Sequence, residues 1–233
     1  MYEVIVLKEG YNVKEGPGIQ KACGSITLLK GARNVIVDTG NPWDKDLIIE
    51  ELQRSGLTPS DIHYVVCTCA HTDKAGNLNV FDKAVCIMAG GVSHRGHHFR
   101  HGFCEGIPYE IDDDIEVVST PGHTGSDVSV IVRNTKHGTV AVTGDLFERL
   151  EDLEDFTLWQ ENSENPEAQQ YNRMEVLKFA DTIIPGHGPM FAVPNEYKQQ
   201  LKMVMYYEQS TVEQGPSGSK TVSESSYTII EEN

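Results

Sequence analysis

Short apolar runs alternate with turn residues through the first half of the chain. Aliphatic residues at Ile26–Leu29 and Val35–Val37, joined by the Gly31–Asn34 turn, predict two consecutive strands. Between residues 44 and 55 apolar residues recur at helical spacing, and Gly56 follows as a stop, which predicts a helix. The same patterns predict three further strands, at residues 1–9, 62–67 and 85–88, and a glycine-rich loop at 90–102.

The second half repeats this plan. Strands are predicted at residues 115–119, 128–132, 140–142 and 183–184, and a hairpin turn at 134–138. Pro166 opens a predicted helix that runs to Ala180, and Asn195 caps another that runs to Tyr207. The segment 148–164 is acidic and is predicted to be exposed.

Two β-rich halves with interspersed helices predict an α+β fold, in which a pair of sheets is covered by helices on the outside. We expect residues 1–208 to form a single domain. Residues 209–233 are rich in Ser, Gly, Thr and Glu and are predicted to be a mobile tail, in which Tyr227–Ile230 could add an edge strand.

Charge narrows the choice of partners. The chain has 35 acidic and 19 basic side chains, for a formal charge of -16. This balance argues against a general electrostatic grip on nucleic acid or on an anionic membrane. No apolar run is long enough to span a membrane, and no signal peptide is evident, so the five cysteines are expected to be reduced thiols in the cytoplasm or the nucleus.

Polar residues at predicted strand ends carry the candidate chemistry. They lie in five places: Asp38, the segment Cys69-Ala70-His71-Thr72-Asp73-Lys74, Pro121-Gly122-His123-Thr124, Gly144-Asp145, and Pro185-Gly186-His187-Gly188. Histidine, aspartate and cysteine together make a ligand set suited to zinc. One such histidine is most often structural, but several such segments in this order predict a metal site.

In this order the segments resemble the metallo-β-lactamase fold superfamily, and the resemblance covers nearly the whole chain. It implies a four-layer αββα sandwich with two zinc sites at one edge, between the sheets. It implies His71 and His123 as ligands of the first metal, Asp73 and His187 as ligands of the second, and Asp145 as the bridge. Asp38 matches an aspartate that positions these ligands without binding metal.

Two positions depart from the family's His-x-His-x-Asp-His segment. Cys69 stands at the first histidine and Lys74 at the last. A thiolate is a good zinc ligand, although it is shorter than imidazole. A charged ammonium cannot bind a metal, but beside Asp73 and Asp145 it could replace the second cation. The alternative is that Lys74 is a solvated loop lysine.

These departures favour zero or one zinc, with two still possible. With one zinc we expect metal-assisted hydrolysis, in which Asp73 orients the attacking water and Lys74 stabilises developing negative charge. The segments at 77–81 and 144–148, with Trp159, resemble a branch of the family that implies an endoribonuclease acting on the 3′ ends of histone pre-mRNA. One alternative is an inactive member that acts as a binding or regulatory protein, and another is a glyoxalase II-like thioester hydrolase.

One basic segment lies outside these motifs. His94–His101 holds four histidines and two arginines. It could bring a surrogate ligand to the depleted site or contact an anionic substrate, and the alternative is an exposed polar loop. The substrate, whether a small molecule or RNA, is left open by the sequence, and a homodimer is expected by resemblance only.

Overall fold

The computed structural model describes residues 1–198, and their strands form two large sheets and one separate hairpin. The first sheet has the strand order β1-β4-β5-β6-β7-β8-β9, with bounds Glu3–Lys8, Ile26–Lys30, Val35–Val37, Tyr64–Val66, Val85–Met88, Gly91–His94 and His97–Phe99. The second has the order β10-β11-β12-β13-β14-β15, with bounds Tyr109–Asp112, Ile115–Ser119, Val128–Thr135, Gly138–Gly144, Thr182–Pro185 and Phe191–Ala192. The hairpin pairs β2 (Tyr11–Gly16) with β3 (Ile19–Cys23).

Strand alternation explains why the two sheets pack face to face. In β5, Val35 and Val37 enter the core between the sheets, whereas Ile36 points to the other face. In β12, Val130 faces the same central core and Ile131 faces outward. A period of two in the side chains therefore gives each central strand two buried faces, which is why these strands read as continuous apolar runs.

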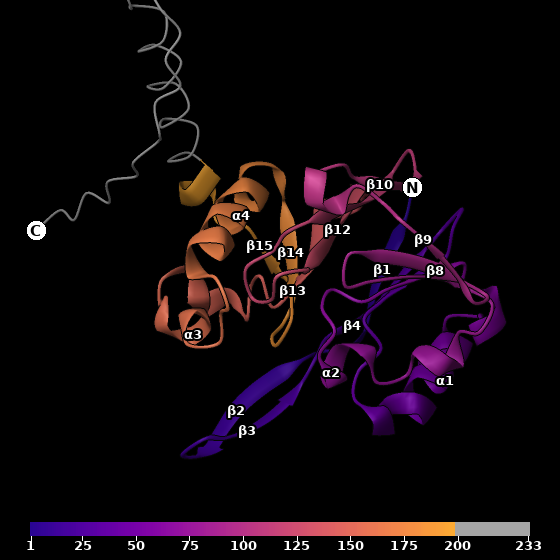
Figure 1. The fold of residues 1–233 in the computed structure, drawn as a ribbon, viewed down its shortest axis with the longest axis horizontal. Coiled ribbons are helices and arrows are strands. Elements are labelled where there is room, and N and C mark those ends of the chain that lie inside the picture. The colour runs from indigo at the N-terminus through magenta and orange to yellow at the C-terminus, as the bar shows by residue number, and fades with distance from the viewer. Residues whose placement is uncertain (199–233) are drawn as a thin grey trace, which may run out of the picture.

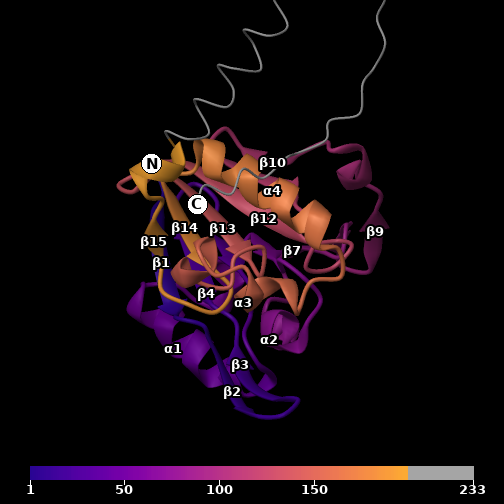
Figure 2. The ribbon, with the colours of Figure 1, turned by 90° about the vertical axis from the view of Figure 1, so that its left-hand side faces the viewer.

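Helices cover the two outer faces. Helix α1 (Lys45–Arg54) buries Ile48 and Leu52 against the first sheet, and α4 (Pro166–Phe179) buries Val176 and Leu177 against the second. Figure 1 shows α1 and α4 on opposite sides with both sheets between them, and Figure 2 shows α4 crossing in front of β12 to β14. The predicted four-layer αββα sandwich is confirmed. Two one-turn helices, α2 (Thr72–Ala75) and α3 (Thr157–Gln160), lie near the sheet edge.

The prediction that residues 90–102 form a loop is wrong. Strands β8 and β9 form a hairpin there, with His94 opposite His97. Its turn, Arg95-Gly96, has positive φ at both residues (47° and 80°), as tight two-residue hairpins require. Gly96, one of the glycines that suggested a loop, closes this turn.

The acidic segment 148–164 is exposed at most of its acidic residues, as predicted, but not at all of them. Glu148 and Asp152 are buried, because Arg173 of α4 pairs with Asp152 at 2.7 Å and the Glu148 amide donates to the same carboxylate. The hairpin β2–β3 and strand β10 were also missed. The predicted tail at 209–233, its edge strand, and most of the predicted helix at 195–207 lie outside the described residues.

Within residues 1–198, no helix is both long and apolar enough to cross a membrane.

Candidate metal centre

The sequence-predicted site residues converge at one edge of the sandwich. His71 follows β6, His123 follows β11, Asp145 follows β13, and His187 follows β14. Strands β5 and β6 run parallel, as do β13 and β14, so the segments that follow each pair leave the sheets at the same end. Asp38, directly after β5, lies there too. The topology therefore assembles residues from both halves of the chain.

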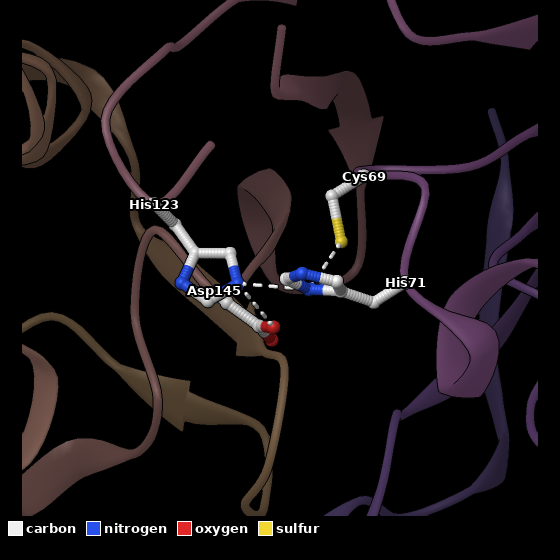
Figure 3. Close-up of side chains that lie close together, drawn as sticks. All are labelled: Cys69, His71, His123 and Asp145. Carbon is white, nitrogen blue, oxygen red and sulfur yellow. Dashed lines mark hydrogen bonds and ion pairs between the residues drawn. The ribbon is translucent and has the colours of Figure 1, made fainter. Parts of the chain in front are cut away.

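Four of these side chains point toward one another (Figure 3). Their donor atoms, from Cys69, His71, His123 and Asp145, all lie within 4.8 Å of one another. The Cys69 sulfur is 3.5 Å from His71 Nδ1, which is 3.1 Å from His123 Nε2. That nitrogen is 3.2 Å from Asp145 Oδ2. We refer to these four residues as the donor cluster.

The donor cluster has the dimensions of a tetrahedral metal site. With zinc bonds of about 2.0–2.1 Å to nitrogen and about 2.3 Å to sulfur, neighbouring donors lie roughly 3.3 Å (N to N) to 3.6 Å (N to S) apart. The three separations above lie close to these values, and the other separations within the cluster are at most 4.8 Å. Three of the residues are buried and His71 is exposed, so the cluster has a solvent-facing side. The residues present therefore fit one metal ion.

Beside the donor cluster, an ammonium group occupies the position where the resemblance implies a second metal. Lys74 is fully buried, and its Nζ lies 2.9 Å from Asp145 Oδ1, 3.0 Å from Asp73 Oδ2 and 3.3 Å from His187 Nε2. The alternative of a solvated loop lysine is therefore wrong. Lys74 contacts the three side chains expected to hold the second metal, and we call these four residues the lysine cluster.

Asp145 belongs to both clusters. Its Oδ2 faces His123, while its Oδ1 faces Lys74 and also lies 3.2 Å from His187 Nε2. Gly186 is required next to it, since a Cβ there would overlap the Asp145 carboxylate. Gly24 is required for a similar reason, because a Cβ would lie 2.7 Å from Lys74 Cδ. These two glycines let the backbone close around the paired charges.

The buried charges shift one another's pKa values. Burial alone would raise the pKa of Asp145, but Lys74 and His187 outweigh it and hold that pKa well below its usual range. Burial likewise opposes charge on Lys74, yet Asp145 and Asp73 raise its pKa well above the ordinary value. The pair therefore stays ionised. In contrast, burial and the Asp145 carboxylate raise the pKa of the Cys69 thiol, which is neutral until a cation binds.

Asp38 holds the segment that carries the first ligands. Its carboxylate accepts hydrogen bonds from the Thr68 amide at 2.8 Å and the Thr68 hydroxyl at 2.9 Å, directly before Cys69. Its backbone has a φ of 60°, a left-handed conformation that few residues other than glycine adopt. Burial is the main cause of its raised pKa of about 7. This placement agrees with the expected positioning role.

The histidine-rich segment does not reach the donor cluster. His94 contacts the Ala84 carbonyl oxygen at 3.3 Å, and His101 contacts that of Ile107 at 3.0 Å. His97 and His98 lie exposed on β9, the edge strand of the first sheet. Among the described residues, the one group of donors close enough to hold a metal excludes all of them. The structure gives no support to a surrogate ligand from this segment.

Sequence reasoning missed Glu148 as a site residue. It is buried, lies 3.9 Å from His187 Nε2, and accepts a hydrogen bond from Asn12 of β2 at 3.5 Å. Burial, followed by the Asp145 carboxylate, raises its pKa to about 7. Its position three residues after Asp145 was the available signal, but the acidic composition of 148–164 suggested a solvated surface.

A four-layer sandwich with histidine, cysteine and carboxylate donors at one edge has the architecture of a metal-dependent hydrolase. The chain belongs to the metallo-β-lactamase superfamily, which it matches over residues 23–187. It is 45% identical over 194 residues to metallo-β-lactamase domain-containing protein 1 of Xenopus laevis, covering 82% of each chain. The human protein of that name is 38% identical over 232 residues, covering 85% of each.

Solved structures agree on the fold. A Thermotoga maritima protein, whose metallo-β-lactamase name is provisional, superposes with a TM-score of 0.63 at 18% identity, covering 82% of this chain and 99% of that one. At this identity the likeness shows the architecture alone.

Proposed function

We propose that this protein is a hydrolase that works with one metal ion, zinc by its donor set, held by Cys69, His71 and His123, which leaves the position beside Asp145 for a bound water. The observation that carries the proposal is that these three donors and Asp145 lie within 4.8 Å of one another, while the Lys74 ammonium lies 2.9 Å from the other oxygen of the Asp145 carboxylate. A divalent ion bound there supplies a Lewis acid and lowers the pKa of a bound water.

Asp73 and Lys74 have separate roles in the proposed reaction. Asp73 is partly exposed, with 15% of its side chain accessible, and is the carboxylate we assign to orient the attacking water and accept its proton. Lys74 is fully buried behind Asp73, Asp145 and His187. We therefore assign it a positioning role, in which it fixes the carboxylates and neutralises them, rather than direct contact with substrate.

The proposed substrate class is a phosphodiester. This extends to the chain the activity implied by the branch of the family that the sequence resembles, an endonuclease that acts on RNA 3′ ends. The chain is 45% identical to the Xenopus relative and covers 82% of its length. A thioester hydrolase and a non-catalytic binding protein are the competing functions, and the same experiment separates them.

The test combines metal content with turnover. Untagged protein is analysed by mass spectrometry for metals and assayed on an RNA oligonucleotide, bis(p-nitrophenyl) phosphate and an acylated glutathione. We expect about one zinc per chain and hydrolysis of the phosphodiesters. Two zincs per chain would contradict the proposed site, and preference for the thioester would favour the glyoxalase II-like function.

The matched comparison is the double variant Cys69→His with Lys74→His. We expect it to bind a second zinc, because it restores both histidine positions and removes the ammonium. A wild-type chain with no metal and no turnover, beside a double variant that gains both, would identify a non-catalytic member of the family.

A further inference from the structure

A cavity opens beside His187. Its volume is about 390 Å³, and it lies between the β2–β3 hairpin and the segment that includes α3. His187 and Glu148 line it, so it adjoins the lysine cluster. Of its lining side chains only Val13 and Leu158 are aliphatic. The rest are charged, amide, hydroxyl or imidazole groups, which suit a polar ligand rather than an acyl chain.

Not every charged side chain that lines this cavity has a partner of opposite charge. Lys14 of the hairpin pairs with Glu161 across the cavity at 3.0 Å. Glu148 faces His187 and accepts from Asn12. In contrast, within residues 1–198 the Arg149 guanidinium has no ion-pair or hydrogen-bond partner, although Arg149 lines the cavity and is half-buried. Arg149 is therefore the cation available to a ligand.

We propose that Arg149 binds a second anionic group of the substrate, a phosphate or a carboxylate, in this cavity while the scissile bond lies at the metal centre. The proposal rests on the hydrolase function above and narrows its substrate class to molecules that carry an oxyanion beside the bond that is cut. A guanidinium matches such groups with two parallel hydrogen bonds. In a nucleic acid strand, the neighbouring phosphate supplies that group.

The position of the cavity supports the proposal that the substrate binds both Arg149 and the metal centre. His187 belongs both to the cavity wall and to the lysine cluster, and the lysine cluster shares Asp145 with the donor cluster, so the cavity adjoins the metal centre. The hairpin side of the cavity offers the amides of Asn12 and Gln20, which can contact the ligand between its two anionic groups.

Equilibrium binding tests the proposal without turnover. The probes are phenyl phosphate and benzoate, with benzyl alcohol as the neutral control, titrated calorimetrically into full-length protein of measured metal content. We expect Arg149→Ala to weaken binding of at least one anion by about 10- to 100-fold, the range for hydrogen bonds to charged groups. Arg149→Lys should retain part of the affinity, and benzyl alcohol should not distinguish the variants.

Arg54→Ala is the matched control, because Arg54 is an exposed arginine at the end of α1, and it should bind as the wild type does. A stronger loss for phenyl phosphate than for benzoate would assign the subsite to phosphate, and the reverse to carboxylate. Equal affinity in wild type and Arg149→Ala, at matched metal content, would overturn the proposal. Arg149-dependent binding by a chain without hydrolase activity would instead refute the proposed function and leave the subsite standing.

Discussion

The donor cluster and the lysine cluster share Asp145 but differ in the cation that neutralises their carboxylates. In the donor cluster, Cys69, His71 and His123 surround a point that a metal ion fits. In the lysine cluster, an ammonium on the chain itself neutralises Asp73 and Asp145. A tethered cation is present at every metal concentration, whereas the donor cluster depends on supply. The comparison teaches that half of a two-cation site can be made part of the fold.

Removing the tethered cation should have the largest effect. Lys74→Met deletes the charge that offsets two carboxylates in a buried setting. Breaking a buried ion pair in this way costs about 3–5 kcal/mol of unfolding free energy. Urea denaturation monitored by circular dichroism measures it.

Lys14→Met, which breaks the exposed pair with Glu161, is the control and should cost less than about 1 kcal/mol. Similar losses in the two variants would show that the lysine cluster contributes no more than a surface pair.

The donor cluster should respond in metal affinity instead. Cys69→Ser replaces a thiolate by a weaker ligand. Since loss of an outer-shell partner already costs 10- to 100-fold in affinity, we expect zinc binding to weaken by about 100-fold or more. Competition with a chromophoric chelator measures this. Cys104→Ser, at an exposed cysteine, should bind zinc normally, and equal affinities for all three proteins would remove Cys69 from the site.

A pH titration can test the difference between the pKa values of two buried aspartates, Asp145 and Asp38. Asp145, in contact with Lys74, keeps a depressed pKa, whereas the pKa of Asp38 is raised to about 7 by burial. Folded Asp38 therefore holds a proton that the unfolded chain has lost, so its contribution to stability falls as pH rises from about 4 to 7 and is constant above.

Asp38→Asn should flatten this dependence. The free energy of unfolding of wild type minus that of Asp38→Asn should decline by up to about 1.4 kcal/mol per pH unit within that window. Denaturation at pH 5, 6, 7 and 8 measures the difference, and a difference that rises with pH has the wrong sign for a buried neutral aspartate.

The smallest effect is expected far from both clusters. The double variant His97→Ala with His98→Ala changes two exposed residues on β9 and should leave metal content unchanged. Metal analysis beside the wild type measures this. Loss of the bound metal in this variant would indicate that His97 or His98 is a metal ligand.

The sequence predicted the framework well because its signals are local. The apolar runs at β4, β5 and β11 predicted strands, and the placement of His71, His123 and His187 after strands marked them as candidate site residues. The strands needed only the period of two, and the rule that chemistry lies at strand ends marked the candidate segments, whereas their meeting at one edge was implied by the family resemblance.

What the sequence could not show depends on distant partners. Asp152 reads as a surface acid until Arg173 is placed beside it, and Lys74 reads equally well as a loop lysine until Asp145 and His187 surround it. The β2–β3 hairpin is rich in polar residues and carries too weak an apolar pattern to predict. The two charged residues were misread because their partners lie on other segments of the chain, whereas the hairpin is a local element that the apolar pattern does not mark.

The long-range contacts that close the site also determine when it can form. The Ser25 amide donates to the Gly186 carbonyl oxygen at 2.8 Å, and His187 Nδ1 lies 3.1 Å from the Cys23 carbonyl oxygen, so residues more than 160 positions apart are joined. Contacts of such high sequence separation are slow to form and come late in folding. During synthesis the early donors Cys69 and His71 emerge long before His123, Asp145 and His187. The growing chain therefore has no complete site, and the protein acquires its metal-binding geometry only when almost all of the described fold has been made.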